Sequence, residues 1–143
     1  MTRALVVLAA LTIWPWCVFA QGGVDPDYYK VHPYQLGKIA KLTITSDSRR
    51  SDYDAAEDCQ SFVMTPKLVR YFLQHGRPVS EAARMKEFDF SSCQAEGSVQ
   101  FASGDEATWL IWRGGTGMML PSSGKFNGKK VYLHCVECED WDY

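Results

Sequence analysis

Histidine and asparagine are both scarce in this chain of 143 residues. The three histidines, His32, His75 and His134, are widely separated, so no two of them stand four residues apart as metal ligands on a helix do. The single asparagine, Asn127, is followed by Gly128 and a lysine, which is not an acceptor sequence for N-glycosylation. The sequence therefore predicts no metal and no cofactor. The missing acceptor also agrees better with a bacterial periplasm than with a eukaryotic secretory route.

An excess of positive charge is missing too. Lysine and arginine number 15 against 17 acids, which gives a formal net charge of −2. The chain contains no basic stripe with aromatic residues interleaved. A mildly acidic protein has no general electrostatic attraction to nucleic acid or to anionic lipid, so we expect no nucleic-acid partner.

The common catalytic motifs are absent as well. There is no Gly-x-Ser-x-Gly elbow and no phosphate-binding loop. The glycine run at 114–117 lacks the lysine that meets phosphates, and it is typical of a turn between two strands. No spacing of carboxylates singles out a pair for acid–base chemistry. These absences favour a role without catalysis.

The longest apolar run stands at the start of the chain. A basic residue precedes a mostly apolar stretch in which Val18 and Ala20 supply the residues that a signal peptidase requires. This pattern predicts a cleaved signal peptide over residues 1–20, with Gln21 as the first mature residue. An uncleaved membrane anchor and a lipid anchor on Cys17 are the alternatives.

Cleavage at this position leaves 123 residues, a length that fits one domain. Residues 21–37 contain glycine, proline and tyrosine and predict an extended N-terminal lead-in. Residues 38–143 predict a single α+β domain. No later apolar run is long enough to span a membrane, so we expect a secreted or periplasmic protein with no integral membrane segment after cleavage.

Two helices follow from capping signals. Thr65 offers a capping hydroxyl and Pro66 suits the first helical position, so the sequence predicts the main helix over 66–75. Gly76 is expected to end this helix in a left-handed conformation. Ser80 is expected to cap a second, shorter helix.

Alternating apolar and polar residues predict the strands. A strand is expected at 40–45, followed by a polar loop at 46–58 with a helical turn near 54–57. Four further strands are expected at 98–102, 107–113, 118–120 and 131–135. The strand at 107–113 is apolar on both faces and should be central. The predicted class is α+β, an antiparallel β-meander sheet with one main helix and one short helix, stapled by disulfides.

Four cysteines remain in the mature chain: Cys59, Cys93, Cys135 and Cys138. An even number in a small exported domain predicts two disulfides. Cys93 precedes the first strand of the predicted meander and Cys135 ends the last, so both should lie at the same end of the sheet. We therefore expect Cys93 to pair with Cys135 or Cys138 and Cys59 to take the remaining partner. The rival pairing is Cys59–Cys93 with a local Cys135–Cys138 bridge.

A redox dithiol and a four-cysteine zinc site are the alternatives to structural disulfides. A redox motif needs a thiolate, and Glu137 between Cys135 and Cys138 opposes its formation. Zinc sites use close pairs of ligands, whereas Cys59 and Cys93 are distant in sequence. Structural disulfides are therefore favoured.

The C-terminal tail is the first candidate for a binding surface. Acids alternate there with aromatic residues, and we select Glu139, Asp140, Trp141 and Asp142. An aromatic anchor between acids suits insertion into a basic cleft. The alternative is a solubilising tail whose tryptophan folds back onto the sheet.

The second candidate surface lies on the predicted strands. Trp109 and Trp112 should point to opposite faces of one strand, so one of them belongs to the core. Trp112, with Arg113 beside it, is then a candidate anchor. His134 on the last strand is a further candidate. The alternatives are two core tryptophans and a histidine that simply faces solvent.

Together these features predict a small exported, non-enzymatic protein that binds another macromolecule, with a protein as its partner. An inhibitor or immunity-type protein for an extracytoplasmic enzyme is the form we expect. The alternatives are a small secreted hydrolase, a thiol-redox enzyme that uses Cys135 and Cys138, and a structural protein of the cell envelope.

Overall fold

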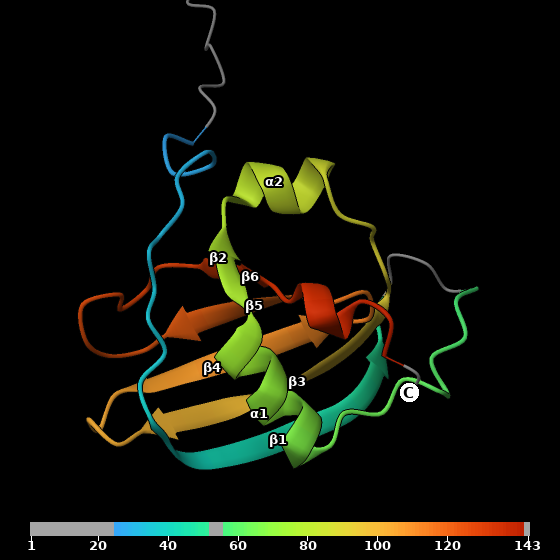
Figure 1. Ribbon diagram of the computed structural model, residues 1–143, viewed down its shortest axis with the longest axis horizontal. Helices are drawn as coiled ribbons and strands as arrows, with labels where there is room; N and C mark the ends of the chain where they lie inside the picture. The colour runs from blue at the N-terminus through green and yellow to red at the C-terminus, as the bar shows by residue number, and fades with distance from the viewer. Residues whose placement is uncertain (1–24, 52–55, 142–143) are drawn as a thin grey trace, which may run out of the picture.

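The computed structural model describes residues 25–51 and 56–141, so the predicted signal peptide and Asp142 lie outside the described residues. Six antiparallel strands form one sheet in the order β1-β3-β4-β5-β6-β2 (Figure 1). The strands are β1 (Ile39–Arg50), β2 (Arg77–Val79), β3 (Cys93–Phe101), β4 (Glu106–Trp112), β5 (Thr116–Pro121) and β6 (Val131–His134). The helices are α1 (Pro66–His75), α2 (Glu81–Lys86) and the 3₁₀ turn η1 (Val136–Cys138). The predicted α+β class, with its meander and its main and short helices, is confirmed.

The meander runs from β3 to β6, and β4 lies inside the sheet as expected. Trp109 and Ile111 are buried on the face that we call the inner face, while Leu110 and Trp112 are half-buried on the opposite, outer face. The two tryptophans therefore do point to opposite sides of one strand. The turn between β3 and β4 uses Gly104, which has a φ of +91° that residues with a Cβ rarely adopt.

Helix α1 covers the inner face. The hydroxyl of Thr65 accepts a hydrogen bond from the backbone N–H of Leu68 at 3.3 Å, which caps the helix as predicted. Its apolar side chains, Val69, Phe72 and Leu73, are buried in the core over the sheet.

The prediction for Gly76 is wrong, because its φ is −61° and the chain leaves the helix in an extended conformation, straight into β2. Glycine is needed here for space instead. A Cβ at Gly76 would come within 2.9 Å of the carbonyl oxygen of Phe72 and 3.3 Å of the Cβ of Leu133.

The first strand is longer than its sequence pattern indicated. β1 continues through residues 46–50, which we had assigned to a loop, and β3 begins at Cys93 rather than at 98. These polar stretches are strands because they pair with each other, with Arg50 opposite Cys93. The pairing is irregular, since its register shifts at three places along β1. The helical turn expected near 54–57 falls partly on residues outside the described ranges.

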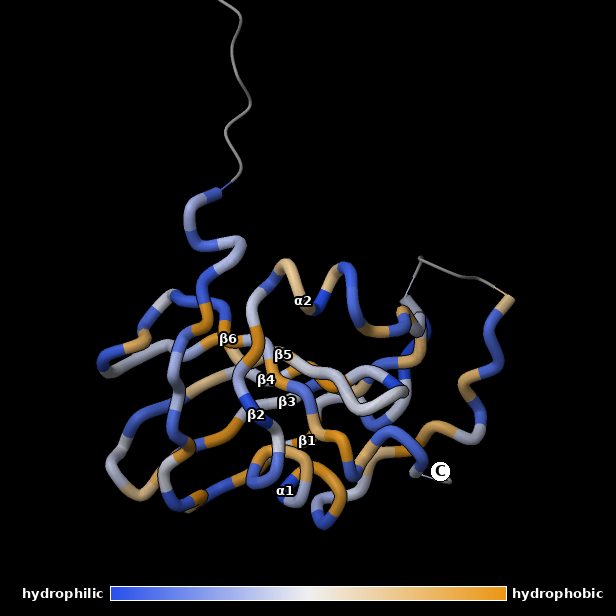
Figure 2. The backbone as a smooth tube through the Cα atoms, turned by 45° about the horizontal axis from the view of Figure 1, so that its top comes forward, coloured by the Kyte–Doolittle hydropathy of each residue, from blue (hydrophilic) through white to orange (hydrophobic). Residues whose placement is uncertain are grey.

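Helix α2 lies on the other side of the sheet from α1. Ser80 caps it, accepting a hydrogen bond from the backbone N–H of Ala83 at 3.1 Å. Arg84 of α2 packs over Trp112, which belongs to the outer face. In Figures 1 and 2 the backbone of α2 is separated from the strands. Side chains such as Arg84 and Trp112 lie between the helix and the sheet.

The described part of the lead-in runs from α2 towards the far end of the sheet. Its start is held by a hydrogen bond from the backbone N–H of Ala82 to the carbonyl of Tyr28, at 2.8 Å. Further along, the rings of Tyr34 and Phe126 make an edge contact with centroids 5.2 Å apart. Among the described residues, no helix combines the length and apolar character that crossing a membrane requires.

The disulfides are Cys59–Cys93 and Cys135–Cys138, so the pairing we favoured is wrong and its rival is present. Cys93 and Cys135 do belong to one end of the sheet, but β4 and β5 separate their strands. Three strand spacings amount to about 14 Å, whereas a disulfide joins Cα atoms about 4–7 Å apart. The loop before α1 brings Cys59 to Cys93 instead, with a Cα separation of 5.3 Å.

Candidate functional site

A row of four side chains crosses the outer face of the sheet beneath α2. Gln94, Trp112, Thr116 and His134 are opposite one another on β3, β4, β5 and β6. We call this set the outer row. Gln94 and Thr116 are buried although both are polar, because the segment that contains α2 covers them. Two of the residues that we selected from the sequence, Trp112 and His134, thus belong to one surface.

Arg84 on α2 is the main cover of this row. Its side chain is only 3% exposed, which is rare for arginine. Its guanidinium carbon lies 4.5 Å from the ring centroid of Trp112 and 4.6 Å from that of Phe90. Both rings present a face to the cation, the arrangement in which aromatic rings attract guanidinium groups.

The polar atoms of Arg84 are not satisfied by this packing. Within the part of the chain that the structure describes, its Nε and Nη1 atoms are buried and have no hydrogen-bond partner. Burial lowers the pKa of Arg84 below its ordinary value, and the nearby Tyr132 acts in the opposite direction. Buried polar groups in folded proteins nearly always find partners, so these two donors require an explanation.

His134 is held at the other end of the outer row. Its Nε2 atom lies 2.5 Å from a carboxylate oxygen of Glu139, and its ring packs on Phe88 with centroids 4.1 Å apart. Thr116, its neighbour in the row, is fully buried. The row therefore combines a histidine with a carboxylate but presents no hydroxyl to solvent, which does not favour the hydrolase alternative.

Arg113 lies away from this surface. Its guanidinium donates to the carbonyl of Asp58 at 3.0 Å and to the hydroxyl of Ser61 at 2.7 Å, and it lies 3.5 Å from the carboxylate of Glu57. These contacts fasten the loop that carries Cys59 to the sheet. The geometry of Arg113 is that of a structural clamp.

The tail residues are divided between different places. The ring of Trp141 packs against the core and makes an edge contact with Tyr71 on α1, at 5.6 Å between centroids. Glu139 pairs with His134, and Asp140 is exposed. Asp142 lies outside the described residues.

Glu57 is a structural residue that no sequence pattern indicates. Its carboxylate accepts hydrogen bonds from the Ser91 hydroxyl at 2.7 Å and from the Ser92 hydroxyl and N–H at 2.8 and 2.6 Å. Burial alone raises the pKa of Glu57, but the hydrogen bonds from Ser91 and Ser92 and the charge of Arg113 outweigh it and hold the pKa below its ordinary value.

We expect Glu57→Gln to lower the free energy of unfolding by about 1–3 kcal/mol at neutral pH, because buried donors lose their carboxylate acceptor. A carboxyl whose pKa is depressed in the folded state stabilises that state above the unfolded pKa and loses this effect as pH falls. The difference between the two proteins should therefore shrink below about pH 4.5. Urea unfolding between pH 3 and 7 measures it. Glu87→Gln, at an exposed acid, is the control, and a difference that stays constant with pH would refute the expectation.

Three exposed side chains surround α2, and sequence patterns did not single them out. Tyr29 is 62% exposed, Met85 48% and Phe90 40%. Tyr29 is joined to the helix through Lys86, whose ammonium group donates to the tyrosine hydroxyl at 3.2 Å. Phe90 is joined through Arg84. We call Tyr29, Met85 and Phe90 the α2 surface.

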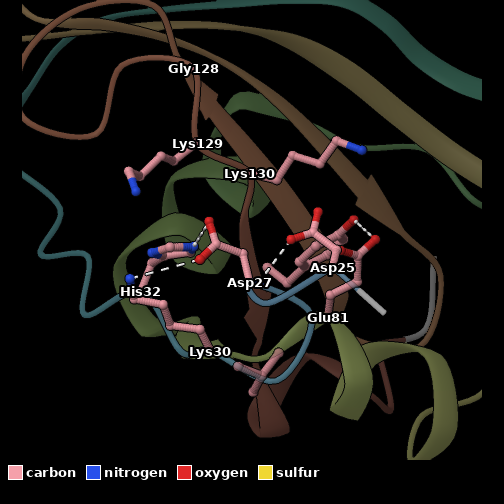
Figure 3. Close-up of a pocket in the computed structure, with 10 residues that line it drawn as sticks. Asp25, Asp27, Lys30, His32, Glu81, Gly128, Lys129 and Lys130 are labelled. Atoms are coloured by element: carbon pink, nitrogen blue, oxygen red, sulfur yellow. Dashed lines mark hydrogen bonds and ion pairs between the residues drawn. The ribbon is translucent and has the colours of Figure 1, made fainter. Parts of the chain in front are cut away.

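A polar hollow of about 240 Å³ lies between the lead-in, the start of α2 and the loop before β6 (Figure 3). Asp27 faces Lys30 at 3.8 Å and His32 at 4.0 Å. Tyr132 donates a hydrogen bond to Glu81 at 2.9 Å, and burial together with that bond raises the pKa of Tyr132 to about 12. Pockets that bind small ligands are mostly lined by apolar side chains, whereas this hollow is lined mainly by charged and polar ones. Asp27 and Glu81 also already have partners within the protein. The hollow is best explained as the joint that fastens the lead-in.

The cysteine pair at the end of β6 offers no exposed thiol. Cys135 and Cys138 are bonded to each other, and neither is exposed. Thiol–disulfide exchange requires access to a sulfur atom. The redox alternative therefore gains no support from the geometry.

No protein-family model, curated protein or solved structure matches this chain. Its function must therefore be inferred from its own residues and contacts.

Proposed function

We propose that this protein is exported and binds another protein through the α2 surface. The single observation that carries this proposal is that three apolar side chains on or beside one short helix, Tyr29, Met85 and Phe90, are exposed. Aromatic side chains and methionines that a small domain leaves exposed near one helix are suited to contact with another protein.

The composition of the region supports protein binding in particular. Aromatic residues, methionine and arginine are enriched at protein–protein interfaces, while lysine and the acids are depleted. The α2 surface supplies two aromatic rings and a methionine, and Arg84 and Trp112 lie directly beneath it. Tryptophan, tyrosine and arginine are also the residues that most often dominate binding energy.

The tyrosine of this surface, Tyr29, is already held in place, together with its neighbour Tyr28. The ammonium group of Lys86 lies over the rings of Tyr28 and Tyr29, at 5.7 and 5.2 Å from their centroids. The two rings meet edge to face with centroids 5.0 Å apart. Side chains that are ordered before binding lose less conformational entropy when a partner arrives.

The acidic tail is less suitable as the main docking element. Its aromatic anchor, Trp141, already packs on the ring of Tyr71. An anchor engaged with its own protein has to leave that contact before it can enter a partner. For this reason we place the docking surface at α2.

Two disulfides among the described residues fit a protein that works outside the cytoplasm. The predicted signal peptide supports export, and a bacterial periplasm is the compartment that we propose. Inhibition or neutralisation of an enzyme in that compartment is the form of binding that we propose, because the histidine of the outer row is paired with Glu139 and the row presents no hydroxyl nucleophile to solvent.

Site-specific cross-linking tests this proposal. A photoreactive amino acid in place of Met85 should capture a partner from the extracytoplasmic fraction, and the same group in place of Leu120 should not. Leu120 is the matched control because it is also apolar and exposed, at 38%, but belongs to β5.

The captured protein is then purified and its affinity measured directly. Met85→Ser should weaken binding at least tenfold, as expected for a central apolar contact, while Leu120→Ser should leave it unchanged. Equal affinity for the wild type and the Met85→Ser variant would exclude the α2 surface. Equal capture at both positions would exclude it as well.

A further inference from the structure

The buried guanidinium of Arg84 contacts two aromatic rings, but two of its nitrogen atoms have no hydrogen-bond acceptor among the described residues. Its faces are covered by the rings of Phe90 and Trp112, at 4.6 and 4.5 Å from the guanidinium carbon. Its edge carries Nε and Nη1, which have no acceptor within the described residues. Aromatic rings attract the face of a guanidinium, but the in-plane N–H groups need oxygen acceptors.

The charge of Arg84 is also not neutralised by a neighbouring acid of its own helix. Glu81, one turn earlier, accepts the hydrogen bond of the Tyr132 hydroxyl at 2.9 Å. Glu87 is exposed at the end of the helix, and no ion pair joins it to Arg84 in the described residues. Burying a cation without a partner lowers the stability of the folded state, because the charge loses its hydration. A buried arginine of this kind therefore suggests a role beyond folding.

A second polar group without a partner lies in the same place. The hydroxyl of Thr116 is buried and makes no hydrogen bond to any described residue. Thr116 is next to Trp112 in the outer row, and Trp112 is the ring on which Arg84 stacks. Two unsatisfied groups, a cationic donor and a hydroxyl, thus lie beneath one short helix.

We propose that Arg84, which packs against the rings of Phe90 and Trp112, is the centre of a binding site for a carboxylate group. A carboxylate is planar and presents two oxygens, which match adjacent N–H groups on the edge of a guanidinium. Its single negative charge neutralises the buried cation. The rings of Phe90 and Trp112 restrict the orientation of the guanidinium.

The site lies at the edge of the α2 surface, because Phe90 belongs to both. The carboxylate of an aspartate or glutamate on the protein partner is one source, and in that respect the inference rests on the proposed function. A free small carboxylic acid is the other source. The chemistry at Arg84 is the same for both, so it can be tested without the partner.

The test is a titration of ¹⁵N-labelled protein with acetate, followed through the side-chain Nε–H signal of Arg84. We expect a saturable shift with an apparent dissociation constant on the order of 1–10 mM, which is reasonable for so small a ligand. Chloride at equal ionic strength should not produce it. The Nε–H of Arg113 is the internal reference, because that guanidinium already donates to Asp58 and Ser61.

Two variants make the assignment specific, and both are followed through the indole N–H of Trp112. Arg84→Lys keeps the charge but loses the planar fork, so it should weaken acetate binding at least tenfold. Lys67→Met removes an exposed cation from α1 and should keep the wild-type response. No saturable shift up to about 100 mM acetate, an equal response to chloride, or unchanged binding in Arg84→Lys would each overturn the proposal.

A short peptide with one glutamate side chain distinguishes the two sources. Binding at least tenfold tighter than that of acetate identifies a partner's side chain as the ligand, while equal binding identifies a free acid. Either result supports the site. Failure of the Met85 cross-linking with acetate binding intact would refute the proposed function alone, and the reverse would refute only the role of Arg84.

Discussion

Replacing Gly97 with alanine is expected to destabilise the protein by about 3 kcal/mol or more, one of the two largest effects we expect of any substitution. A Cβ at this position would lie 2.0 Å from the carbonyl oxygen of Thr43 and 2.5 Å from Cζ2 of Trp109. The first contact is with the backbone of the neighbouring strand and the second with a buried indole. Neither atom is the end of a flexible chain, so relief requires β1 to separate from β3.

Unfolding in urea under oxidising conditions measures this effect for Gly97→Ala. Gly37→Ala is the control, because the atoms nearest to its added Cβ belong to the side chain of Phe101, the closest being the Phe101 Cβ at an ordinary distance of 3.5 Å. We expect a change within about 0.5 kcal/mol there. An unfolding midpoint for Gly97→Ala equal to that of the wild type would contradict the close packing of Trp109 on Gly97.

Removing the Cys59–Cys93 disulfide should cost about 4 kcal/mol, and removing Cys135–Cys138 about 2 kcal/mol. The difference follows from the size of the closed loop, since the two pairs are separated by 34 and 3 residues in sequence. A longer loop restricts the unfolded chain more, so its crosslink stabilises the folded state more.

The measurement compares two double-serine variants with the wild type in the absence of reductant. The Cys59/Cys93 variant should unfold at a clearly lower urea concentration than the Cys135/Cys138 variant. If the order were reversed, loop closure would not be the dominant contribution. Mass mapping of unreduced peptides should find these two pairs and no link between Cys93 and Cys135.

The sequence predicted the elements whose causes are local. The capping hydroxyl of Thr65, with the proline after it, gave the bounds of α1, and Ser80 gave the start of α2. The meander followed from alternation and glycine turns. Residues 46–50 could not be recognised as a strand, because an edge strand needs few apolar residues when its backbone pairs with a neighbour. The disulfide pairing failed for a similar reason, since it depends on how many strands lie between two cysteines.

The candidate site was only partly visible in the sequence. Trp112 and His134 were selected, and they do lie in one row, which strand periodicity could suggest but not establish. Arg84 was missed because arginine is normally exposed, and nothing local indicates that two rings will enclose it. Arg113 was selected for its neighbour in sequence, whereas its contacts are made with a loop more than 50 residues earlier.

The two edges of the sheet restrict the way in which this protein can associate. β1 has a displaced register at three places, and β2 is a three-residue strand with Pro78 at its centre. A strand from another molecule needs a regular row of free backbone groups to extend a sheet, and neither edge provides one. β-augmentation and amyloid-type stacking are therefore disfavoured at both ends, so the partner binding that we propose would take place through side chains.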